Sequence, residues 1–171
     1  TAVAGNHNLL LIGPPGSGKT MLARRIPTVL PEMTIKEQIE TTKIYSYAGK
    51  LTKHMPIISE RPFRYLSSNI TTSSLVGGGN AVIPGEVSFA HNGVLFWDEM
   101  LETPRKILEQ LRVPLSEKSI HIIRNGRSVI FPSNFILVGA SNPCKCGFLG
   151  DENRFCTCTQ TEINIYRSKL S

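Results

Sequence analysis

Three runs of consecutive apolar residues stand out along the chain: Leu9–Ile12, Val94–Trp97 and Phe135–Ala140. An unbroken apolar run, as opposed to an alternating one, is typical of a strand that is buried on both faces of a parallel sheet. Polar residues follow each run, and open α/β sheets bind their ligands at the carboxyl ends of the strands. The pattern therefore predicts an α/β fold with functional residues at one end of a parallel sheet.

Prolines and capping signals delimit the helices between these strands. The first helix is expected to begin near Lys19 and to end near Ile26, because Pro27 and Pro31 oppose its continuation. With 171 residues, the chain has the length of one domain. Further helices are predicted after the capping box of Thr34 and Glu37 as far as Ala48, over Ser73–Val76, after the N-cap Thr103 with Pro104 at the first position, and after the capping box of Thr159 and Glu162.

Two stretches show neither the apolar pattern of a helix nor that of a strand. Residues 50–68 contain two prolines and are interpreted as a loop. The triple glycine Gly77–Gly79 resembles a phosphate loop only superficially, because no Lys-Thr pair follows it. We interpret it as a turn or as the tip of an insertion.

A β-hairpin is predicted in the second half of the chain. The segments Ile120–Ile123 and Ser128–Phe131 flank an Asn-Gly pair, which supplies the two positive φ angles of a tight turn. Arg124 and Arg127 lie at its tip. They are either solvated, or they form a basic finger that contacts nucleic-acid phosphates.

The first apolar run leads into GPPGSGKT, which matches the phosphate-loop pattern G-x-x-x-x-G-K-[ST] between a strand and a helix. Glycines let successive backbone N–H groups point into one concavity, and the helix that follows adds its positive end there. Lys19 would reach the β- and γ-phosphates of a nucleoside triphosphate, and the Thr20 hydroxyl would ligate Mg²⁺. A plain Gly/Pro turn is the alternative, but it does not account for the match at every fixed position. The predicted nucleotide-binding loop consists of Gly13, Pro14, Pro15, Gly16, Ser17, Gly18, Lys19 and Thr20.

The other two apolar runs also end in polar residues. Asp98 would help to hold Mg²⁺, and Glu99 would polarise the attacking water as a general base. Adjacent Asp and Glu favour hydrolysis of the nucleotide over phosphoryl transfer to a small acceptor; the alternative is a pair of solvated acids before a helix. Asn142 either orients the same water or forms a turn before Pro143.

The four cysteines form two close pairs within 15 residues, and four thiolates in such pairs can bind a tetrahedral Zn²⁺. The C-x-C spacing needs a sharply turned loop, which Gly147 and Gly150 make feasible. A structural zinc is favoured over a catalytic one, because the protein would fill all four ligand positions. Free thiols are the alternative. The candidate ligands are Cys144, Cys146, Cys156 and Cys158.

Composition and charge change this picture little. Hydrophobic and charged contents of 40% and 19% are ordinary for a globular protein. The net charge of +6 permits nucleic-acid binding but is also common on solvated surfaces. No apolar run has the length of a membrane span, the N-terminus lacks a signal-peptide pattern, and clustered cysteines beside a nucleotide site indicate a reduced, cytoplasmic compartment. The first five residues resemble a cut made ahead of a domain.

These motifs together resemble those of the magnesium-chelatase-like AAA+ ATPases, and most of all those of the bacterial ComM (YifB) branch. The resemblance covers almost the whole chain. Its most specific parts are the paired C-x-C elements and the phrase that begins Pro84-Gly85-Glu86, since the phosphate loop alone would indicate only an NTPase. The matching stretches are Asn6–Arg25, Arg61–Arg64, Leu75–Gly79, Pro84–Glu99, Leu111–Leu115 and Asn142–Asp151.

The resemblance implies an AAA+ P-loop core over residues 1–171, a three-layer sandwich with a parallel sheet in the strand order 5-1-4-3-2. The cysteine loop 144–158 is embedded in it, and the hairpin is the pre-sensor-1 hairpin. Ring assembly, usually as a hexamer with ATP between subunits, is also implied. The matching positions are Lys19 and Thr20 for Walker A, Asp98 and Glu99 for Walker B, and Asn142 for sensor 1.

Three functions remain open at this point. The ComM branch implies a DNA helicase that promotes branch migration during natural transformation. The chelatase motor subunit instead drives Mg²⁺ insertion into protoporphyrin. The alternative from a different functional class is a nucleotide-binding or assembly module that zinc stabilises and that does not hydrolyse ATP.

The chain also departs from the family pattern. Ser67 and Ser68 stand about where the family carries a His-His pair. Family members continue into a further strand, arginine-bearing elements and a helical lid, so we expect a core fragment that needs those elements for activity. Without the further strand, Leu9–Ile12 would lie at a sheet edge.

Overall fold

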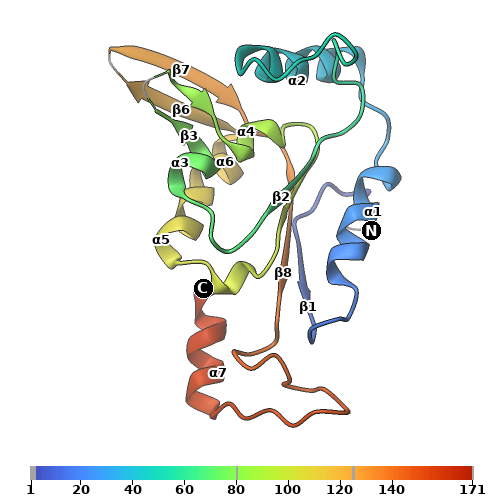
Figure 1. The fold of residues 1–171 in the computed structure, drawn as a ribbon, viewed down its shortest axis with the longest axis vertical. Helices are drawn as coiled ribbons and strands as arrows, with labels where there is room; N and C mark the ends of the chain where they lie inside the picture. The colour runs from blue at the N-terminus through green and yellow to red at the C-terminus, as the bar shows by residue number, and fades with distance from the viewer. Residues whose placement is uncertain (1–2, 80, 125, 171) are drawn as a thin grey trace.

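The computed structural model describes residues 3–79, 81–124 and 126–170, and a parallel sheet lies at its centre (Figure 1). The strands are β1 (Leu9–Ile12), β2 (Phe63–Leu66), β5 (Val94–Trp97) and β8 (Ile136–Ser141), in the order β1-β8-β5-β2. Every pairing is parallel. All residues of the two central strands, β5 and β8, are buried, as their unbroken apolar sequences predict. The predicted α/β class is confirmed, and the order matches the 1-4-3-2 part of the implied sheet.

Alternate residues of β5 enter two separate cores, because successive side chains of a strand point to opposite faces. Val94 and Phe96 pack with Ala23 of α1 (Lys19–Val29) on one face. Leu95 and Trp97 pack on the other face with α3 (Thr72–Val76) and α4 (Glu86–Phe89). Helices therefore cover both faces of the sheet, as in a three-layer sandwich (Figure 1).

The remaining elements surround this sandwich. They are α2 (Ile35–Tyr47), β3 (Gly77–Gly78), β4 (Ile83–Pro84), a 3-10 turn (Met100–Glu102), α5 (Arg105–Leu108), a second 3-10 turn (Glu109–Leu111), α6 (Arg112–Glu117), β6 (Ser119–Arg124), β7 (Arg127–Pro132), α7 (Gln160–Arg167) and a last 3-10 turn (Ser168–Leu170). The triple glycine is thus partly a strand, since β3 pairs with β4.

Local signals placed most helix boundaries correctly. The predicted capping boxes are present at Thr34 and Thr159, at the starts of α2 and α7. The prediction that the first helix ends near Ile26 is wrong, because α1 continues through Pro27 to Val29. A proline within the last turn removes only one backbone hydrogen bond, and α1 ends at Val29 because Leu30, the residue before Pro31, is extended.

The interpretation of residues 50–68 as a loop is wrong at Phe63–Leu66, which form β2. This strand lies at the edge of the sheet and pairs with β5. Its four residues are too few for a periodic signal, so its extended conformation depends on the hydrogen bonds that β5 supplies.

Thr103 does not cap the next helix as predicted. The residue that precedes α5 is Pro104, and no side-chain cap is present there. The Thr103 hydroxyl instead accepts a hydrogen bond of 2.9 Å from the Trp97 indole N–H. Both residues are fully buried, so the indole N–H would otherwise be left unpaired in the core.

We therefore expect Thr103→Val to destabilise the fold by about 1–3 kcal/mol, because it leaves the indole N–H of Trp97 unsatisfied without changing side-chain volume. Urea-induced unfolding would measure this loss. Thr161→Val, at an exposed position of α7, is the control and should change stability by no more than about 0.5 kcal/mol. Equal stability of the two variants would contradict the assigned role of Thr103.

The arginines of the sequence RPFR hold the sheet to its neighbours. Arg64, in β2, forms a two-pronged ion pair of 2.6 and 2.9 Å with Glu86 at the start of α4. Arg61 pairs with Glu37 of α2 at 3.2 Å and donates to the Asn92 carbonyl at 2.7 Å. Both arginines therefore join the edge of the sheet to neighbouring elements, Arg64 to α4 and Arg61 to α2.

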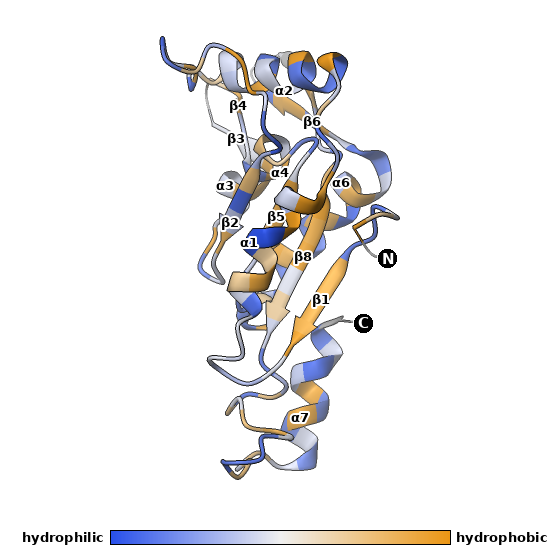
Figure 2. Ribbon diagram, turned by 90° about the vertical axis from the view of Figure 1, so that its right-hand side faces the viewer, coloured by the Kyte–Doolittle hydropathy of each residue, from blue (hydrophilic) through white to orange (hydrophobic). Residues whose placement is uncertain are grey.

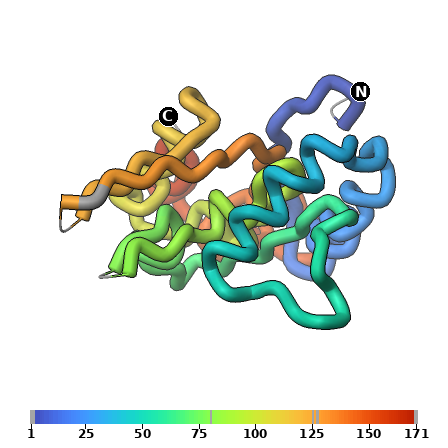
Figure 3. The backbone as a smooth tube through the Cα atoms, turned by 90° about the horizontal axis from the view of Figure 1, so that it is seen from above, coloured from blue at the N-terminus to red at the C-terminus, as the bar shows by residue number. Residues whose placement is uncertain are grey.

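The predicted hairpin is confirmed as β6 and β7, which pair from Ser119 with Pro132 to Arg124 with Arg127. It projects from the body on the side away from α1 (Figures 1 and 3). The Arg124 side chain is exposed, whereas Asn125 and the side chain of Arg127 lie outside the described residues.

Apolar residues concentrate in the sheet, as Figure 2 shows for β1, β5 and β8. β1 is the last strand on its side of the described sheet, as expected, and Leu10 and Ile12 remain 38% and 52% exposed. Among the described residues, none of the helices combines the length and apolarity that a bilayer crossing requires.

Candidate active site

The carboxyl ends of the strands border a cleft of about 400 Å³. Phosphate-loop residues line one side of it, and residues that follow β5 and β8 line the other. The structure thus brings together the phosphate loop, Asp98, Glu99 and Asn142, which are distant in sequence. The lining residues are Pro15, Gly16, Ser17, Gly18, Lys19, Thr20, Met21, Asp98, Glu99, Ser141 and Asn142.

A larger hollow of about 730 Å³ lies between α1 and the loop that precedes β2. It includes Arg24, His54 and Arg61, but neither the phosphate loop nor the acids after β5. The smaller cleft is therefore the better candidate for catalysis, since it alone of these two combines anion-binding backbone with carboxylates.

The phosphate loop is joined to β8 and closes around its own lysine. The Gly13 N–H donates to the Ser141 carbonyl at 3.2 Å, which continues the pairing of β1 with β8. The Lys19 ammonium donates to the carbonyls of Gly13 and Pro14 at 2.8 and 2.9 Å. Gly18 precedes α1 with φ of 80°, a left-handed conformation that favours glycine. The loop therefore places a cation at the positive end of a helix, where a phosphate would bind.

Partial burial lowers the pKa of Lys19 below its ordinary value, and the carboxylate of Asp98 acts in the opposite sense. Both effects reflect the position of the ammonium inside the cleft, where a polyphosphate would meet it.

Asp98 lies at the centre of the polar groups in the cleft. Its Oδ2 accepts from the Thr20 hydroxyl at 3.4 Å and from the Tyr65 hydroxyl at 3.0 Å, and its Oδ1 accepts from the Glu99 N–H at 3.0 Å. The Thr20 hydroxyl and a carboxylate oxygen are hard oxygen ligands, which suit Mg²⁺. Thr20 and Asp98, predicted from separate motifs, are therefore close enough to share one ion.

Glu99 is exposed to the cleft and has an unusual backbone. Its φ and ψ are 49° and 41°, a left-handed conformation that is uncommon for a residue with a side chain. Its Oε2 accepts from the Ser68 hydroxyl at 3.4 Å. Such strain is concentrated at functional sites.

Sequence reasoning missed Tyr65 and Ser68, which both contact the acids of the cleft. They belong to the segment that was interpreted as a loop. Partial burial, followed by the hydrogen bond to Asp98, raises the pKa of the Tyr65 hydroxyl, which keeps it a donor. The position of β2 could have indicated these two residues, because a strand that pairs in parallel with β5 must end beside Asp98.

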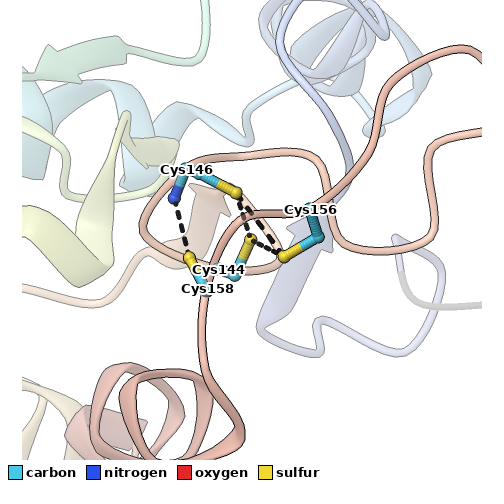
Figure 4. A group of neighbouring side chains, drawn as sticks. All are labelled: Cys144, Cys146, Cys156 and Cys158. Atoms are coloured by element: carbon cyan, nitrogen blue, oxygen red, sulfur yellow. Dashed lines mark hydrogen bonds between the residues drawn. The ribbon is translucent and has the colours of Figure 1, made fainter.

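The four cysteines converge between β8 and α7, as Figure 4 shows. The Sγ atom of Cys144 lies 3.4 Å from that of Cys146 and 3.7 Å from that of Cys156, and Cys146 and Cys156 are 3.5 Å apart. The four Sγ atoms all lie within 4.8 Å of one another. A tetrahedral zinc with Zn–S bonds of about 2.3 Å needs S–S separations of about 3.8 Å, whereas a disulfide needs about 2.05 Å. The donor set therefore fits a bound metal, since none of the four cysteines is in a disulfide.

The thiols differ in acidity. Backbone N–H groups of Phe148 and Thr157 lower the pKa of Cys146 to about 5. The pKa of Cys156 rises to about 12: the Cys158 N–H lowers it, but desolvation and the thiols of Cys146 and Cys144 outweigh that effect. A proton shared between close sulfur atoms is what a divalent metal displaces when it binds.

The protein family described as "Magnesium chelatase, subunit ChlI" matches residues 1–171. The chain belongs to this magnesium-chelatase-like family. Among relatives in it, competence protein ComM of Haemophilus influenzae is 45% identical over 172 residues, and YifB of Escherichia coli is 43% identical over 171 residues. These alignments cover 99% and 98% of this chain but 33% of each relative. The chain thus spans about a third of the length of these members of the magnesium-chelatase-like family.

Solved structures agree with a magnesium-chelatase-like, AAA+ fold. One chain from the complex between subunits BchI and BchD of magnesium chelatase aligns with a TM-score of 0.61 at 21% identity. The alignment covers 96% of this chain and 59% of the chain from the complex. NtrX from Brucella abortus in complex with ATP aligns with a TM-score of 0.56 at 19% identity, over 99% of this chain and 32% of that chain. At these identities the likeness concerns the fold.

Proposed function

We propose that this chain is an ATP-binding and ATP-hydrolysing motor core of a ComM-type protein that acts on DNA, as a branch-migration helicase does. The observation that carries the proposal is the convergence of Lys19, Thr20, Asp98, Glu99 and Asn142 on one cleft. The identity to competence protein ComM, spread over nearly the whole chain, supports the DNA role.

Each side chain has a distinct task in the proposed reaction. Phosphate-loop N–H groups and the Lys19 ammonium bind the β- and γ-phosphates and stabilise the charge that develops there. Mg²⁺, held by Thr20 and Asp98, would add charge neutralisation and orient the phosphates. Glu99 accepts a proton from water as the water oxygen bonds to the γ-phosphorus and the bond to the β–γ bridging oxygen breaks. The Asn142 amide, which faces the phosphate loop from the same side of the cleft as Glu99, orients that water.

The test is steady-state ATP hydrolysis by the full-length protein, with and without branched DNA. We expect branched DNA to stimulate turnover. Arg124→Ala should reduce the DNA affinity and lower the salt dependence of binding by about one phosphate contact, with basal turnover unchanged. Lys53→Ala is a matched control, because Lys53 is an exposed cation on the loop before β2 and does not belong to the hairpin.

Two results would move the assignment elsewhere. Turnover that is indifferent to DNA but depends on protoporphyrin would favour the motor that drives magnesium insertion. ATP binding without any turnover, in the full-length protein, would favour a non-hydrolysing assembly module. Loss of stimulation in Lys53→Ala, but not in Arg124→Ala, would exclude the hairpin as the DNA contact.

We also propose a ring, in which copies of the chain share ATP at their interfaces. The likeness to the assembled BchI–BchD complex supports this arrangement. Light scattering of the full-length protein with ATP should give the mass of six copies. A monomer at micromolar concentration with saturating ATP would contradict it.

We propose that the four cysteines hold a structural zinc, which requires the reduced thiols of a cytoplasmic location. Freshly purified protein should contain about one zinc per chain, as metal analysis would measure. Cys146→Ser should lose most of this zinc, whereas Glu152→Gln, at an exposed position of the same loop, should retain it. A zinc content well below one per chain in the wild-type protein would instead indicate free thiols.

A further inference from the structure

The cysteine loop (residues 144–158) is attached at both ends to the end of β8, which Asn142 follows directly. Its first ligand, the buried Cys144, follows Asn142 by two residues. At its other end, α7 returns to the same place: the Tyr166 hydroxyl lies 3.1 Å from the Ser141 hydroxyl, and Arg167 donates to the Pro143 carbonyl at 3.4 Å. The loop is therefore a closed structure built on the end of β8.

Between these attachments the loop packs against the phosphate loop. Gly147 is buried, and its N–H donates to the Cys144 carbonyl at 3.0 Å in the turn that follows the first cysteine pair. A Cβ atom at Gly147 would lie 3.1 Å from Cδ of Pro15 and 3.8 Å from Cγ of Asn142. The backbone at Gly147 thus lies close to one residue from each wall of the nucleotide cleft, with too little room for a Cβ atom beside Pro15.

The Asp151 carboxylate accepts from the N–H groups of Asn153 and Arg154 and orders the tip of this loop, whereas the cysteines bring its two ends together. The loop contains no helix or strand between β8 and α7, and Phe155 is 96% exposed. A metal would join the first cysteine pair, which precedes Gly147, to the second pair, which precedes α7. Cross-linking of this kind restricts the alternative conformations of a loop, so it restricts the position of Gly147 as well.

We propose that the metal-loaded cysteine loop is a positioning element of the nucleotide cleft, which holds Pro15 and Asn142 in place through Gly147 and the Cys144 backbone. Metal removal then lowers the affinity for nucleotide, and by reciprocity nucleotide raises the affinity for metal by the same factor. This inference rests on the proposed binding of ATP and of zinc, and it adds an energetic link between them.

The link can be measured without turnover, in the full-length protein with a slowly hydrolysed fluorescent ATP analogue. Zinc-depleted wild-type protein should bind the analogue about fivefold or more weakly than the zinc-loaded form, and added zinc should restore the affinity. When the analogue is bound, the affinity for zinc, measured by competition with a chromophoric chelator, should rise by the same factor.

Two glycines of the loop provide a matched pair of variants. Gly147 and Gly150 both have left-handed backbones, with φ of 88° and 79°, but a Cβ atom at Gly150 would meet nothing within 4 Å. Gly147→Ala should bind zinc yet show weaker analogue binding and a reduced effect of zinc. Gly150→Ala carries similar backbone strain and should behave as wild type.

The outcomes separate this inference from the proposed function. Normal binding of both zinc and analogue, with no effect of either on the other, would overturn the link and leave the ATPase assignment intact. The same holds if Gly147→Ala and Gly150→Ala behave alike. Absence of zinc in wild-type protein would also overturn the link, and absence of analogue binding in all forms would overturn the proposed function with it.

Discussion

Lys19→Ala should weaken ATP binding by about 10- to 100-fold, because hydrogen bonds to a charged group contribute about 1.5–3 kcal/mol. The ammonium already lies inside the loop, bonded to the carbonyls of Gly13 and Pro14. Its replacement removes both the charge that would meet the β- and γ-phosphates and a contact that shapes the loop. Titration with a fluorescent ATP analogue would measure the change.

Lys43→Ala is the control for this experiment, since Lys43 is an exposed cation on α2. It should bind the analogue as wild type does, which separates the loss of a specific contact from a general decrease in positive charge. Circular dichroism of Lys19→Ala should remain that of a folded protein. An unchanged affinity in folded Lys19→Ala would refute the phosphate-loop assignment.

Glu99→Gln should lower ATP turnover by about 10²- to 10⁴-fold, the usual contribution of a general base. The amide keeps the size of the carboxylate and its hydrogen bond with Ser68, but it cannot accept the proton of the attacking water. ATP affinity should remain within about threefold of wild type, because Glu99 contacts none of the predicted phosphate-binding groups in the structure. Single-turnover hydrolysis and analogue binding, measured on the same sample, would test both parts.

Glu117→Gln serves as the matched control, because Glu117 is an exposed acid at the end of α6 and lies outside the cleft. It should hydrolyse ATP at the wild-type rate. Full turnover by Glu99→Gln would remove Glu99 as the base. A large loss of ATP affinity in the same variant would mean that Glu99 holds the nucleotide.

The parts of the site that the sequence predicted are those that depend on local chemistry. The phosphate loop requires glycines and Lys19 at fixed spacing, and the capping boxes at Thr34 and Thr159 join residues three positions apart. The cysteine cluster could be predicted for the same reason, since two C-x-C pairs leave few other roles for their thiols.

The parts that were missed depend on partners from elsewhere in the chain. β2 is a strand because β5 pairs with it, and only this pairing brings Tyr65 to Asp98. The sequence around Thr103 is typical of an N-cap. Its hydroxyl instead accepts from the buried indole N–H of Trp97, which has to be paired in the core. The close approach of Gly147 to Pro15 brings together two loops that are more than 130 residues apart, and no spacing rule predicts it.

The burial of Trp97 has an optical consequence. It is the single tryptophan of this chain, it is fully enclosed, and it directly precedes Asp98. Its emission should be blue-shifted and shielded from aqueous quenchers, and it reports on one strand of the candidate active site. Within this chain, intrinsic fluorescence is therefore a built-in probe that follows the strand beside Asp98 and Glu99 without any label.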